Sequence, residues 1–301
     1  MNHIFKEVKA IVNMEPTVLD LKGPITVMGP LHGEGDALIT LMSMVGPPTD
    51  HQYLFIGNFA GLGFASLELV FMLFCLKLKY PEHIHLLKGF HEDPALFKEI
   101  DFYEDMQRRG LLPEEVKTTE DLRSVDLVTE ALAALPLAAT INKEILCMHG
   151  GPGRYLREEG LSRLRQVSRP PENDLDLNLT IETMWAVMEF VEKPVSRQND
   201  SRDEMPSFTD AEATLFCQEN KIKLLIRGRQ LIDQGFLNKP NEVLTIISAA
   251  SYLNNFRNHG VALGFDEHST QVTVIRWLCR DAEPGSLDDE KPSAYRNAIP
   301  P

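Results

Sequence analysis

Apolar runs typical of strands alternate, over the first third of the chain, with segments whose apolar residues recur at helical spacing. In chain order these segments are 25–28, 36–44, 53–57, 64–79, 84–87 and about 93–109, of which the first, third and fifth are strand-like. An amphipathic helix over 4–12 precedes them. A β-α-β-α-β-α order predicts a largely parallel sheet with helices packed on it, and therefore an α/β fold.

The middle of the chain is predicted to be mostly helical and the end mostly β. Helices are expected over 114–135, 154–167, 181–191 and 210–219, and strands over 138–141, 144–148, 223–227, 243–248, 261–265 and 271–278. Asn142-Lys143 is expected to form a tight turn. The polar stretches 168–180 and 192–206 are predicted to be loops, the second long and mobile. We expect one domain over 1–280 and an acidic, disordered tail over 281–301.

Composition excludes some kinds of binding partner and indicates the cellular compartment. The formal net charge of −14 argues against binding to nucleic acid or to a membrane surface. Four cysteines lack the spacing of zinc ligands, and two lie in apolar runs, which is typical of buried reduced thiols. The N-terminus lacks the apolar core of a signal peptide, and the apolar stretch 64–78 is too short to cross a bilayer. We therefore expect a cytoplasmic or nuclear protein that is not secreted.

Four strand-like runs end at a polar residue that lies beside glycine. They end at Gly29-Pro30-Leu31-His32-Gly33, Gly57-Asn58, Gly89-Phe90-His91 and His149-Gly150-Gly151. An α/β protein presents its site residues in this way, at the carboxyl ends of its strands. The sequence thus predicts that these residues meet in one site.

These runs, with their order, resemble the PPP family of serine/threonine protein phosphatases, closest to the type-1 enzyme. PITVMGPLHGE is similar to the family's strand ending in G-D-x-H-G, YLFIGNFAGLG to that ending in G-D-x-V-D-R-G, and IHLLKGFHED to that ending in G-N-H-E. ALPLAATINKEILCMHGG, IRGRQ and TIISAASYL are similar to L-P-L-A-A…H-G-G, R-A-H-Q and S-A-P-N-Y-C. The resemblance covers about residues 5–280. It implies a metallophosphatase-type central β-sandwich flanked by helices, with two divalent metals (manganese, iron or zinc) where the strand ends converge.

The resemblance also shows which metal ligands are altered. The six ligand positions are, in chain order, Pro30, His32, Asn58, Phe90, His149 and Arg229. Only His32 and His149 remain as strong ligands, and both carboxylates are lost. Two divalent ions a few ångströms apart need anionic ligands, and a protonated arginine cannot coordinate a metal. We therefore expect no metal cofactor.

The proton-transfer residues are altered as well. His91 matches the family's general-acid histidine, but its orienting aspartate corresponds to Gly61 and the neighbouring phosphate-binding arginine to Leu62. A histidine without a carboxylate partner has no stabilised cation. Residues 59–63 are expected to be apolar and flexible. Trp185 and Tyr252, which match site-adjacent aromatic residues of the family, are expected to serve in packing.

Two arginines leave room for an anion site. Arg202 falls at the family's second phosphate-binding arginine when counted without gaps from Arg229. Arg227 and Arg229, two apart on a predicted strand, are expected to face the same side. With His32 and His149 these residues could form a metal-free phosphate pocket. The alternative, which we favour, is that Arg229 pairs with a local carboxylate.

The family's groove for short motifs of regulatory subunits is only partly retained. Its lining strand corresponds to Ser269-Thr270-Gln271-Val272-Thr273, which is more polar than in the family, whereas Ile145 and Leu224 still fit. Proteins, among them phosphoproteins or phosphatase regulatory subunits, are the expected partners.

Three functions therefore stay open. The leading hypothesis is a pseudophosphatase that acts by binding, as scaffold, decoy or regulatory subunit in phospho-signalling. The second is a phosphoprotein reader that uses Arg202 and Arg229. The third is a residual phosphoesterase with a single metal on His32, Asn58 and His149. If the chain is an enzyme, it is expected to be a serine/threonine protein phosphatase.

Overall fold

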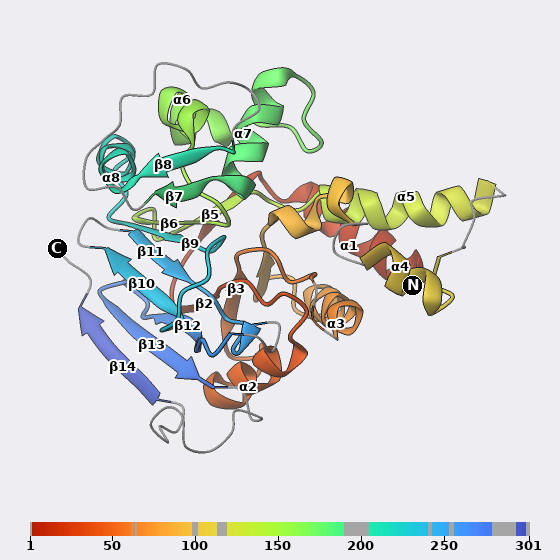
Figure 1. The fold of residues 1–301 in the computed structure, drawn as a ribbon, viewed down its shortest axis with the longest axis horizontal. Coiled ribbons are helices and arrows are strands. Elements are labelled where there is room, and N and C mark those ends of the chain that lie inside the picture. Colours follow the sequence, from red (N-terminus) through yellow and green to blue (C-terminus); the bar gives the residue numbers. More distant parts are fainter. Residues whose placement is uncertain are drawn as a thin grey trace.

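Two six-stranded sheets pack face to face at the centre of the protein (Figure 1). The structure is a computed structural model, and it describes residues 2–61, 63, 65–97, 102–112, 119–189, 205–239, 243–252, 256–278 and 293–298. Within these ranges, the side chains of 119–125, 238–239 and 293–298 are not described. The apolar cluster between the sheets includes Val27, Leu54, Ile226 and Leu263, all of them fully buried. These residues come from strands of both sheets, so the sandwich has one continuous interior.

The strand order of each sheet mixes parallel and antiparallel neighbours. The first sheet runs β1 (Val18–Leu21), β5 (Ala138–Ile141), β6 (Ile145–Met148), β9 (Leu224–Arg227), β11 (Val243–Ile246) and β10 (Phe236–Lys239). The second runs β14 (Ser293–Ala298), β13 (Gln271–Trp277), β12 (Gly260–Phe265), β2 (Ile25–Met28), β3 (Gln52–Phe55) and β4 (Ile84–Leu86). A separate parallel pair joins β7 (Val187–Glu189) to β8 (Ser207–Thr209). The predicted parallel core is confirmed in β2, β3 and β4.

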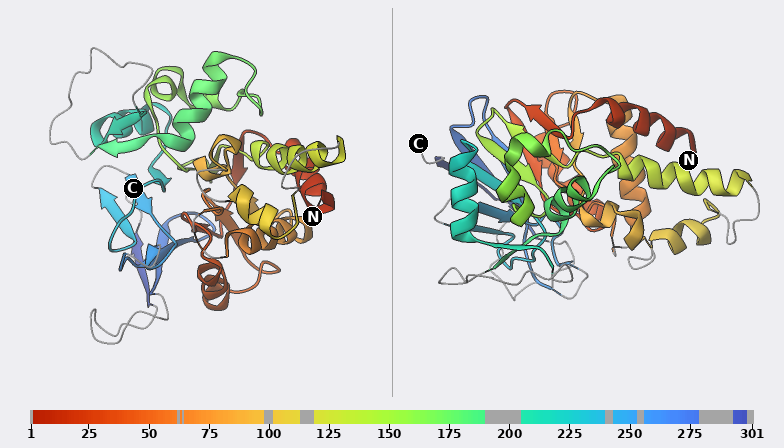
Figure 2. Two further views of the ribbon diagram at one scale, coloured as in Figure 1. Left: turned by 45° about the vertical axis from the view of Figure 1, so that its right-hand side comes forward. Right: turned by 90° about the horizontal axis from the view of Figure 1, so that it is seen from above.

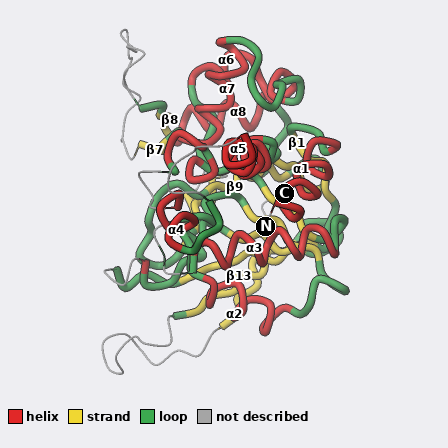
Figure 3. The backbone as a smooth tube through the Cα atoms, turned by 90° about the vertical axis from the view of Figure 1, so that its right-hand side faces the viewer, coloured by secondary structure: helices red, strands yellow, loops and turns green. Residues whose placement is uncertain are grey.

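Helices cover the outer face of each sheet. The second sheet packs against α1 (Asn2–Met14), α2 (Gly35–Val45), α3 (Ser66–Lys79), α4 (Phe102–Arg108) and α5 (Thr119–Ala133). Figure 3 faces α1, α3, α4 and α5, which lie together at one end of the molecule. The first sheet packs against α6 (Arg154–Leu164), α7 (Asp174–Trp185) and α8 (Asp210–Glu219), and Figure 2 shows them away from that helical end. The predicted sandwich flanked by helices is therefore confirmed.

Two predicted helices differ from those of the structure. The segment predicted as one helix over 93–109 contains the single-turn helix η2 (Pro94–Leu96) and then α4, and it follows a first single-turn helix, η1 (Phe90–Glu92). Residues 98–101 lie outside the described part. The helix predicted over 181–191 begins earlier and ends earlier, as α7, and is followed by β7. Its start is set by Asn173, whose side chain accepts a hydrogen bond from the Asp176 backbone N–H at 2.9 Å. The sequence prediction placed a loop over 168–180 and therefore missed this N-terminal cap and the first turns of α7.

The C-terminal tail contains a strand. The sequence predicts disorder over 281–301, whereas Ser293–Ala298 forms β14 and pairs antiparallel with β13 from Gln271 to Arg276. Backbone hydrogen bonding to a strand edge depends little on side-chain polarity, so a polar composition gave no sign of it. The other residues of that tail, and most of the predicted loop 192–206, lie outside the described residues. No described helix is long and apolar enough to cross a membrane.

Candidate functional site

The carboxyl ends of strands from both sheets meet at one edge of the sandwich. The Pro30 carbonyl, after β2, accepts hydrogen bonds from the backbone N–H groups of Ser248 and Ala249, after β11, both at 3.0 Å. The His149 ring, after β6, is bonded through Nδ1 to the Ile56 carbonyl, after β3, at 2.9 Å. The structure thus brings together strand ends that are far apart in the sequence, as the glycine-flanked runs predicted.

Glu92 organises the backbone of this edge, although sequence reasoning gave it no role. Its buried carboxylate accepts hydrogen bonds from the backbone N–H groups of Asn58 at 2.7 Å, Gly89 at 2.8 Å and Ala60 at 3.1 Å. Burial raises the pKa of Glu92 to about 7, although these N–H groups and Lys88 oppose the shift. The only sequence signal was a glutamate directly after His91. The carboxylate joins the loop after β3 to the loop after β4.

Asn58 is fully buried and has a φ of 53°, a backbone conformation that asparagine tolerates better than most residues. Its side-chain Oδ1 accepts a hydrogen bond from the His91 backbone N–H at 3.0 Å. This bond fixes the orientation of the carboxamide, so that Nδ2 is the free end. Nδ2 is buried and has no hydrogen-bond partner among the described residues. A donor therefore stands where a metal would need an oxygen ligand.

His32 and His91 lie against each other, with ring centroids 4.9 Å apart. The Nδ1 of His91 is 2.8 Å from the Ala60 carbonyl oxygen, and because a carbonyl only accepts, Nδ1 carries the proton. Burial lowers the pKa of His91 to about 4, and burial followed by the neighbouring His91, His149 and Arg229 lowers that of His32. Both imidazoles are accordingly neutral near pH 7.

The segment expected to be flexible is packed where the structure describes it. Phe59, Ala60 and Gly61 are buried, and Leu62 lies outside the described residues. A Cβ on Gly61 would lie 2.7 Å from the Cα of His32, so a side chain at 61 would force a backbone shift. Apolar residues were interpreted as mobile because their burial under the site could not be seen in the sequence. This close approach leaves no room for an orienting aspartate beside His91.

Phe90, Trp185 and Arg229 form a cation–aromatic group at this edge, referred to below as the Arg229 cluster. The guanidinium carbon of Arg229 lies 4.3 Å from the Phe90 ring centroid and 5.4 Å from that of Trp185. The two rings are 4.6 Å apart. Cation–π contacts of this kind stabilise a partly desolvated guanidinium. The cluster also touches the neighbouring histidine, since Phe90 is 5.4 Å from the His149 ring.

Among the described residues, Arg229 makes no ion pair of the kind that the sequence favoured. Its hydrogen bonds go from Nε to the Trp185 carbonyl at 3.3 Å and from a terminal nitrogen to the Met205 Sδ at 3.4 Å. In the part of the chain that the structure describes, no carboxylate lies within ion-pair distance of it. Burial lowers its pKa, and the guanidinium remains a cation. Aromatic faces, rather than a carboxylate, hold it in place.

Arg227 and Arg229 do not extend a common strand face, contrary to the sequence prediction. β9 ends at Arg227, and Arg229 has a φ of 68°, so the two-residue periodicity stops between them. Arg227 is fully buried, over the Phe208 ring at 5.6 Å. Its guanidinium donates to the Gly150 and Ala186 carbonyls, the Gln230 Oε1 and the Thr245 Oγ1. Burial lowers its pKa to about 9. Arg227 is therefore a packing residue.

The residues at the six ligand positions do not fit a dinuclear metal centre. His149 keeps a buried Nε2 without a partner among the described residues, and His32 has an unpartnered Nδ1. Asn58 turns a donor inward, and Pro30 and Phe90 have no coordinating atoms. No group of three or more His, Cys, Asp or Glu side chains close enough to hold a metal occurs within the described ranges. Two neutral imidazoles cannot offset the repulsion between two divalent ions.

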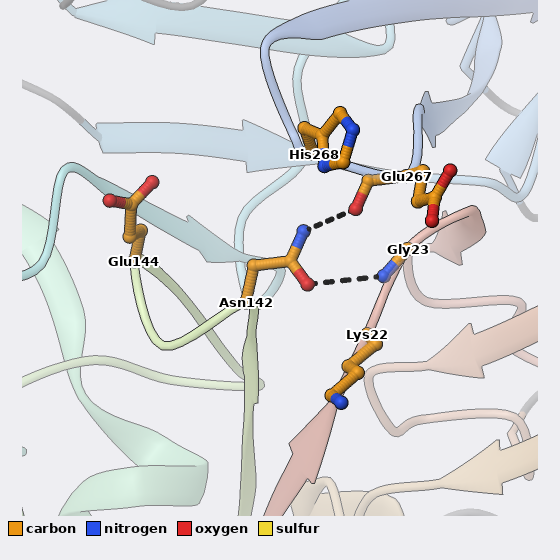
Figure 4. A pocket seen from close by; sticks show the side chains of 6 residues that line it. All are labelled: Lys22, Gly23, Asn142, Glu144, Glu267 and His268. Carbon is orange, nitrogen blue, oxygen red and sulfur yellow. Dashed lines mark hydrogen bonds between the residues drawn. The ribbon is translucent and has the colours of Figure 1, made fainter.

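A separate shallow pocket lies at the opposite ends of the strands (Figure 4). It measures about 380 Å³ and is lined by Lys22, Gly23, Asn142, Glu144, Glu267 and His268. The Asn142 Nδ2 donates to the Glu267 carbonyl at 2.9 Å and to the Ser269 Oγ at 2.8 Å, and its Oδ1 accepts from the Gly23 N–H at 3.4 Å. The predicted Asn142-Lys143 turn is confirmed, with φ values of 51° and 63°. Ile145 and Leu224, assigned to the regulatory groove, pair in register nearby and are buried.

The comparisons with known proteins agree with this architecture. The family model described as calcineurin-like phosphoesterase matches residues 23–228. The serine/threonine-protein phosphatase PP1-delta of Caenorhabditis elegans is 30% identical over 268 residues, which are 89% of this chain and 83% of that protein.

Two solved structures show the same fold. The first is a protein serine/threonine phosphatase from Saccharomyces cerevisiae that is described as similar to human phosphatase PP5. It superposes with a TM-score of 0.75 at 22% identity, and the match covers 97% of this chain and 91% of the yeast chain. A cold-active protein-tyrosine phosphatase from Shewanella has a TM-score of 0.60 at 16% identity, with 89% and 82% covered. The chain therefore belongs to the calcineurin-like phosphoesterases and, among them, to the PPP family of serine/threonine protein phosphatases.

Proposed function

We propose that this chain is a pseudophosphatase, a catalytically inactive member of its family that acts in phospho-signalling by binding other proteins. The observation that carries the proposal is the Arg229 cluster, in which a cation and an aromatic ring, Arg229 and Phe90, stand at two positions where the resemblance places metal ligands, with the Trp185 ring beside them. A scaffold, a decoy or a regulatory subunit would use the fold in this way. The cytoplasm and the nucleus are the expected compartments.

Loss of the metals removes the source of the nucleophile. In the family, two metal ions activate a water and neutralise the phosphate. Here the side chains that remain toward the centre are neutral imidazoles and the Nδ2 of Asn58. None of them lowers the pKa of a water, and His91 donates its Nδ1 proton to a backbone carbonyl without a carboxylate partner. Neither nucleophile generation nor protonation of a leaving group is supported.

The two alternatives receive less support from the geometry. A single metal on His32, Asn58 and His149 would require the Oδ1 of Asn58, which already accepts from the His91 N–H. A phosphate pocket with two arginines would require Arg202, which lies outside the described residues. Because Arg227 uses its donors internally, it cannot replace Arg202. The pseudophosphatase is therefore the function we favour.

The proposal is tested by metal content and hydrolysis measured on one sample. The chain is purified without chelators, and its manganese, iron and zinc are quantified beside PP1-delta of Caenorhabditis elegans as the positive reference. Hydrolysis of p-nitrophenyl phosphate is then followed with added manganese. We expect no stoichiometric metal and no turnover above the buffer rate. Two bound metals per chain together with metal-dependent hydrolysis would disprove the proposal.

A restored variant provides the matched control. Pro30→Asp, Asn58→Asp, Phe90→Asn and Arg229→His together return the six ligand types that the resemblance implies. This variant is expected to bind manganese more tightly than the parent, because two carboxylates and a third imidazole return. If parent and variant bind manganese equally, the four substitutions are not what determines metal binding.

A further inference from the structure

Arg227 and Arg229 are two residues apart but differ in the use of their donors. Arg227 is fully buried and donates to four different oxygen acceptors. Arg229 is partly exposed, and its two hydrogen bonds, at 3.3 Å to the Trp185 carbonyl and 3.4 Å to the Met205 sulfur, are long. Neither acceptor is charged. Arg229 therefore keeps N–H groups available for an external acceptor.

The aromatic rings fix the guanidinium without consuming its donors. Phe90 and Trp185 contact the guanidinium from 4.3 Å and 5.4 Å, measured from ring centroid to guanidinium carbon. A guanidinium whose faces contact aromatic rings still has N–H groups free along its edge. These N–H groups can donate two parallel hydrogen bonds to the two oxygens of a carboxylate. The backbone turns after β9, where Arg229 has a φ of 68°, and this turn fixes the direction in which the Arg229 side chain leaves the backbone. The cation is thus held before any ligand arrives, which lowers the entropy cost of binding.

The charge of the surroundings limits what kind of anion fits. The His91 and His149 rings use Nδ1 in hydrogen bonds to the carbonyls of Ala60 and Ile56, so each has only Nε2 left for another contact. Arg227 uses its donors internally. Among the described residues, the centre therefore offers one guanidinium with available donors, that of Arg229. A singly charged carboxylate is matched by one guanidinium, whereas a phosphate dianion usually requires more cations or a metal.

The border of the cluster is apolar and partly exposed. Met205 is 51% exposed and Phe256 is 44% exposed. Phe256 stacks on Tyr252 at 6.0 Å between centroids, and Tyr252 in turn lies 4.6 Å from the His32 ring. Arginine and aromatic side chains are the residues that most often dominate binding energy at protein interfaces. A ligand that reaches Arg229 would therefore contact apolar surface beside its charged group.

We propose that the Arg229 cluster is a docking site for a carboxylate of a partner protein, from aspartate, glutamate or a chain terminus, that is flanked by an apolar side chain. The inference rests on the proposed function, since a chain that acts by binding needs a binding surface. It places a ligand without phosphorus where the family places the phosphate ester. The Arg229 guanidinium, which no described carboxylate pairs, provides the charge complementarity, and Met205, Tyr252 and Phe256 provide the apolar contact.

The test uses 3-phenylpropionate, which combines a carboxylate with an apolar ring, and follows the two tryptophan indole N–H signals by NMR. Trp185 belongs to the cluster, and Trp277, which is buried in β13, serves as the internal reference. We expect a saturable shift of the Trp185 signal at millimolar ligand and none of the Trp277 signal. The neutral analogue 3-phenylpropanamide is expected to bind about tenfold more weakly, because the charge-assisted hydrogen bonds are lost.

Arg229→Gln should weaken binding of 3-phenylpropionate about tenfold, and Arg229→Lys should recover only part of the loss. Arg108→Ala, which removes the same charge from the exposed end of α4, should bind like the parent. Thermal melting of each variant establishes that it is folded. Equal binding of the amide, unchanged binding by Arg229→Gln, or no saturable Trp185 shift would overturn the proposal.

Phenyl phosphate separates the two kinds of anion. Binding of phenyl phosphate about tenfold tighter than 3-phenylpropionate would overturn the carboxylate assignment and support a phosphate reader. Metal content and p-nitrophenyl phosphate hydrolysis are measured on the same sample. If metal and turnover are absent and 3-phenylpropionate also fails to bind, the docking site is refuted while the pseudophosphatase proposal stands.

Discussion

The Pro30 ring lies directly against Gly228, so that a Cβ on Gly228 would be 2.6 Å from the Pro30 Cγ and 2.7 Å from its Cδ. Both residues stand at strand ends, after β2 and β9. The resemblance implies aspartate at the first position and alanine at the second. Proline in place of aspartate is therefore compatible with this backbone because the alanine methyl is also missing. The two substitutions form one steric unit.

Gly228→Ala should destabilise the protein by about 1–3 kcal/mol, because the added methyl overpacks a buried contact with the rigid Pro30 ring. Pro30→Ala/Gly228→Ala should recover most of this loss, which would give a coupling free energy of about 1 kcal/mol or more. Gly264→Ala is the matched control, since its Cβ would meet nothing closer than 3.7 Å. Urea unfolding of the parent, Pro30→Ala, Gly228→Ala and the double variant measures the cycle. Additive effects at Pro30 and Gly228 would show that the contact does not limit the site.

Glu92→Gln should cost about 1–3 kcal/mol in the free energy of unfolding. The carboxylate receives three backbone N–H donors on its two oxygens, and a glutamine would turn an N–H₂ group toward one of them. Glu92→Asp keeps both oxygens but shortens the side chain, and it tests whether reach or acceptor number matters. Chemical denaturation provides the measurement. A chemical denaturation curve of Glu92→Gln identical to that of the parent would contradict the assigned role.

Buried histidines should make the fold sensitive to acid. Burial lowers the pKa of His85 to about 3 and of His91 to about 4, from an ordinary value of 6.5, and those of His32 and His149 are also lowered. Between the folded and the ordinary pKa the unfolded chain binds more protons, so the free energy of unfolding should fall as pH drops below 6.5. Each titrating group contributes up to about 1.4 kcal/mol per pH unit.

Glu92 acts in the opposite direction, because its raised pKa of about 7 makes its contribution fall as pH rises from 4.5 to 7. Burial also raises the pKa of Glu34 and of Glu182, and four histidines outweigh these three carboxyl groups, so denaturant unfolding should show lower stability at pH 5 than at pH 7. His85→Gln, which leaves the site intact, should reduce the slope between these values. A slope that is unchanged in this variant would refute the contribution of His85.

Asn142→Ala, at the strand ends opposite the candidate site, should lower the free energy of unfolding by about 1–3 kcal/mol. Its side chain joins three turns through Gly23, Glu267 and Ser269, and its φ of 51° adds backbone strain for alanine. Asn142→Gly separates the two causes, since glycine tolerates the conformation but lacks the amide. Both variants are compared by thermal and urea unfolding. If Asn142→Gly is as stable as the parent, the hydrogen bonds contribute little.

Deletion of residues 279–301 should promote self-association. β14 pairs with β13 along Gln271 to Arg276, and its loss leaves that strand as a free edge with apolar side chains such as Val274 and Trp277. A deletion of 299–301 alone, which keeps β14, is the control. Sedimentation velocity over a range of concentrations measures the effect. A truncated chain that stays monomeric at all concentrations would argue against a protective role of β14.

Much of the fold could be read from local pattern. The runs at Ile25–Met28 and Ile84–Leu86, with α3 between them in the chain, have the periodicity of their structures, and β2, β3 and β4 pair in parallel as predicted. Elements defined by long-range pairing were missed. β1 is a short edge strand that pairs with β5, where Val18 lies opposite Ala138, and β14 is polar, so that the strand character of both comes from their neighbours. β10 was also missed, although it pairs locally with β11, because it is a short strand at the edge of the first sheet.

The candidate site divides in the same way. The sequence by itself determined which residue types stand at the strand ends, because Pro30, Asn58, Phe90 and Arg229 either have or lack coordinating atoms whatever surrounds them. Only the tertiary structure decided what these side chains contact. Arg229 lies on Phe90 and Trp185 rather than on a carboxylate, Glu92 collects three N–H groups, and Pro30 rests on Gly228. Chemical capacity belongs to a residue, whereas contact depends on packing between segments far apart in the chain.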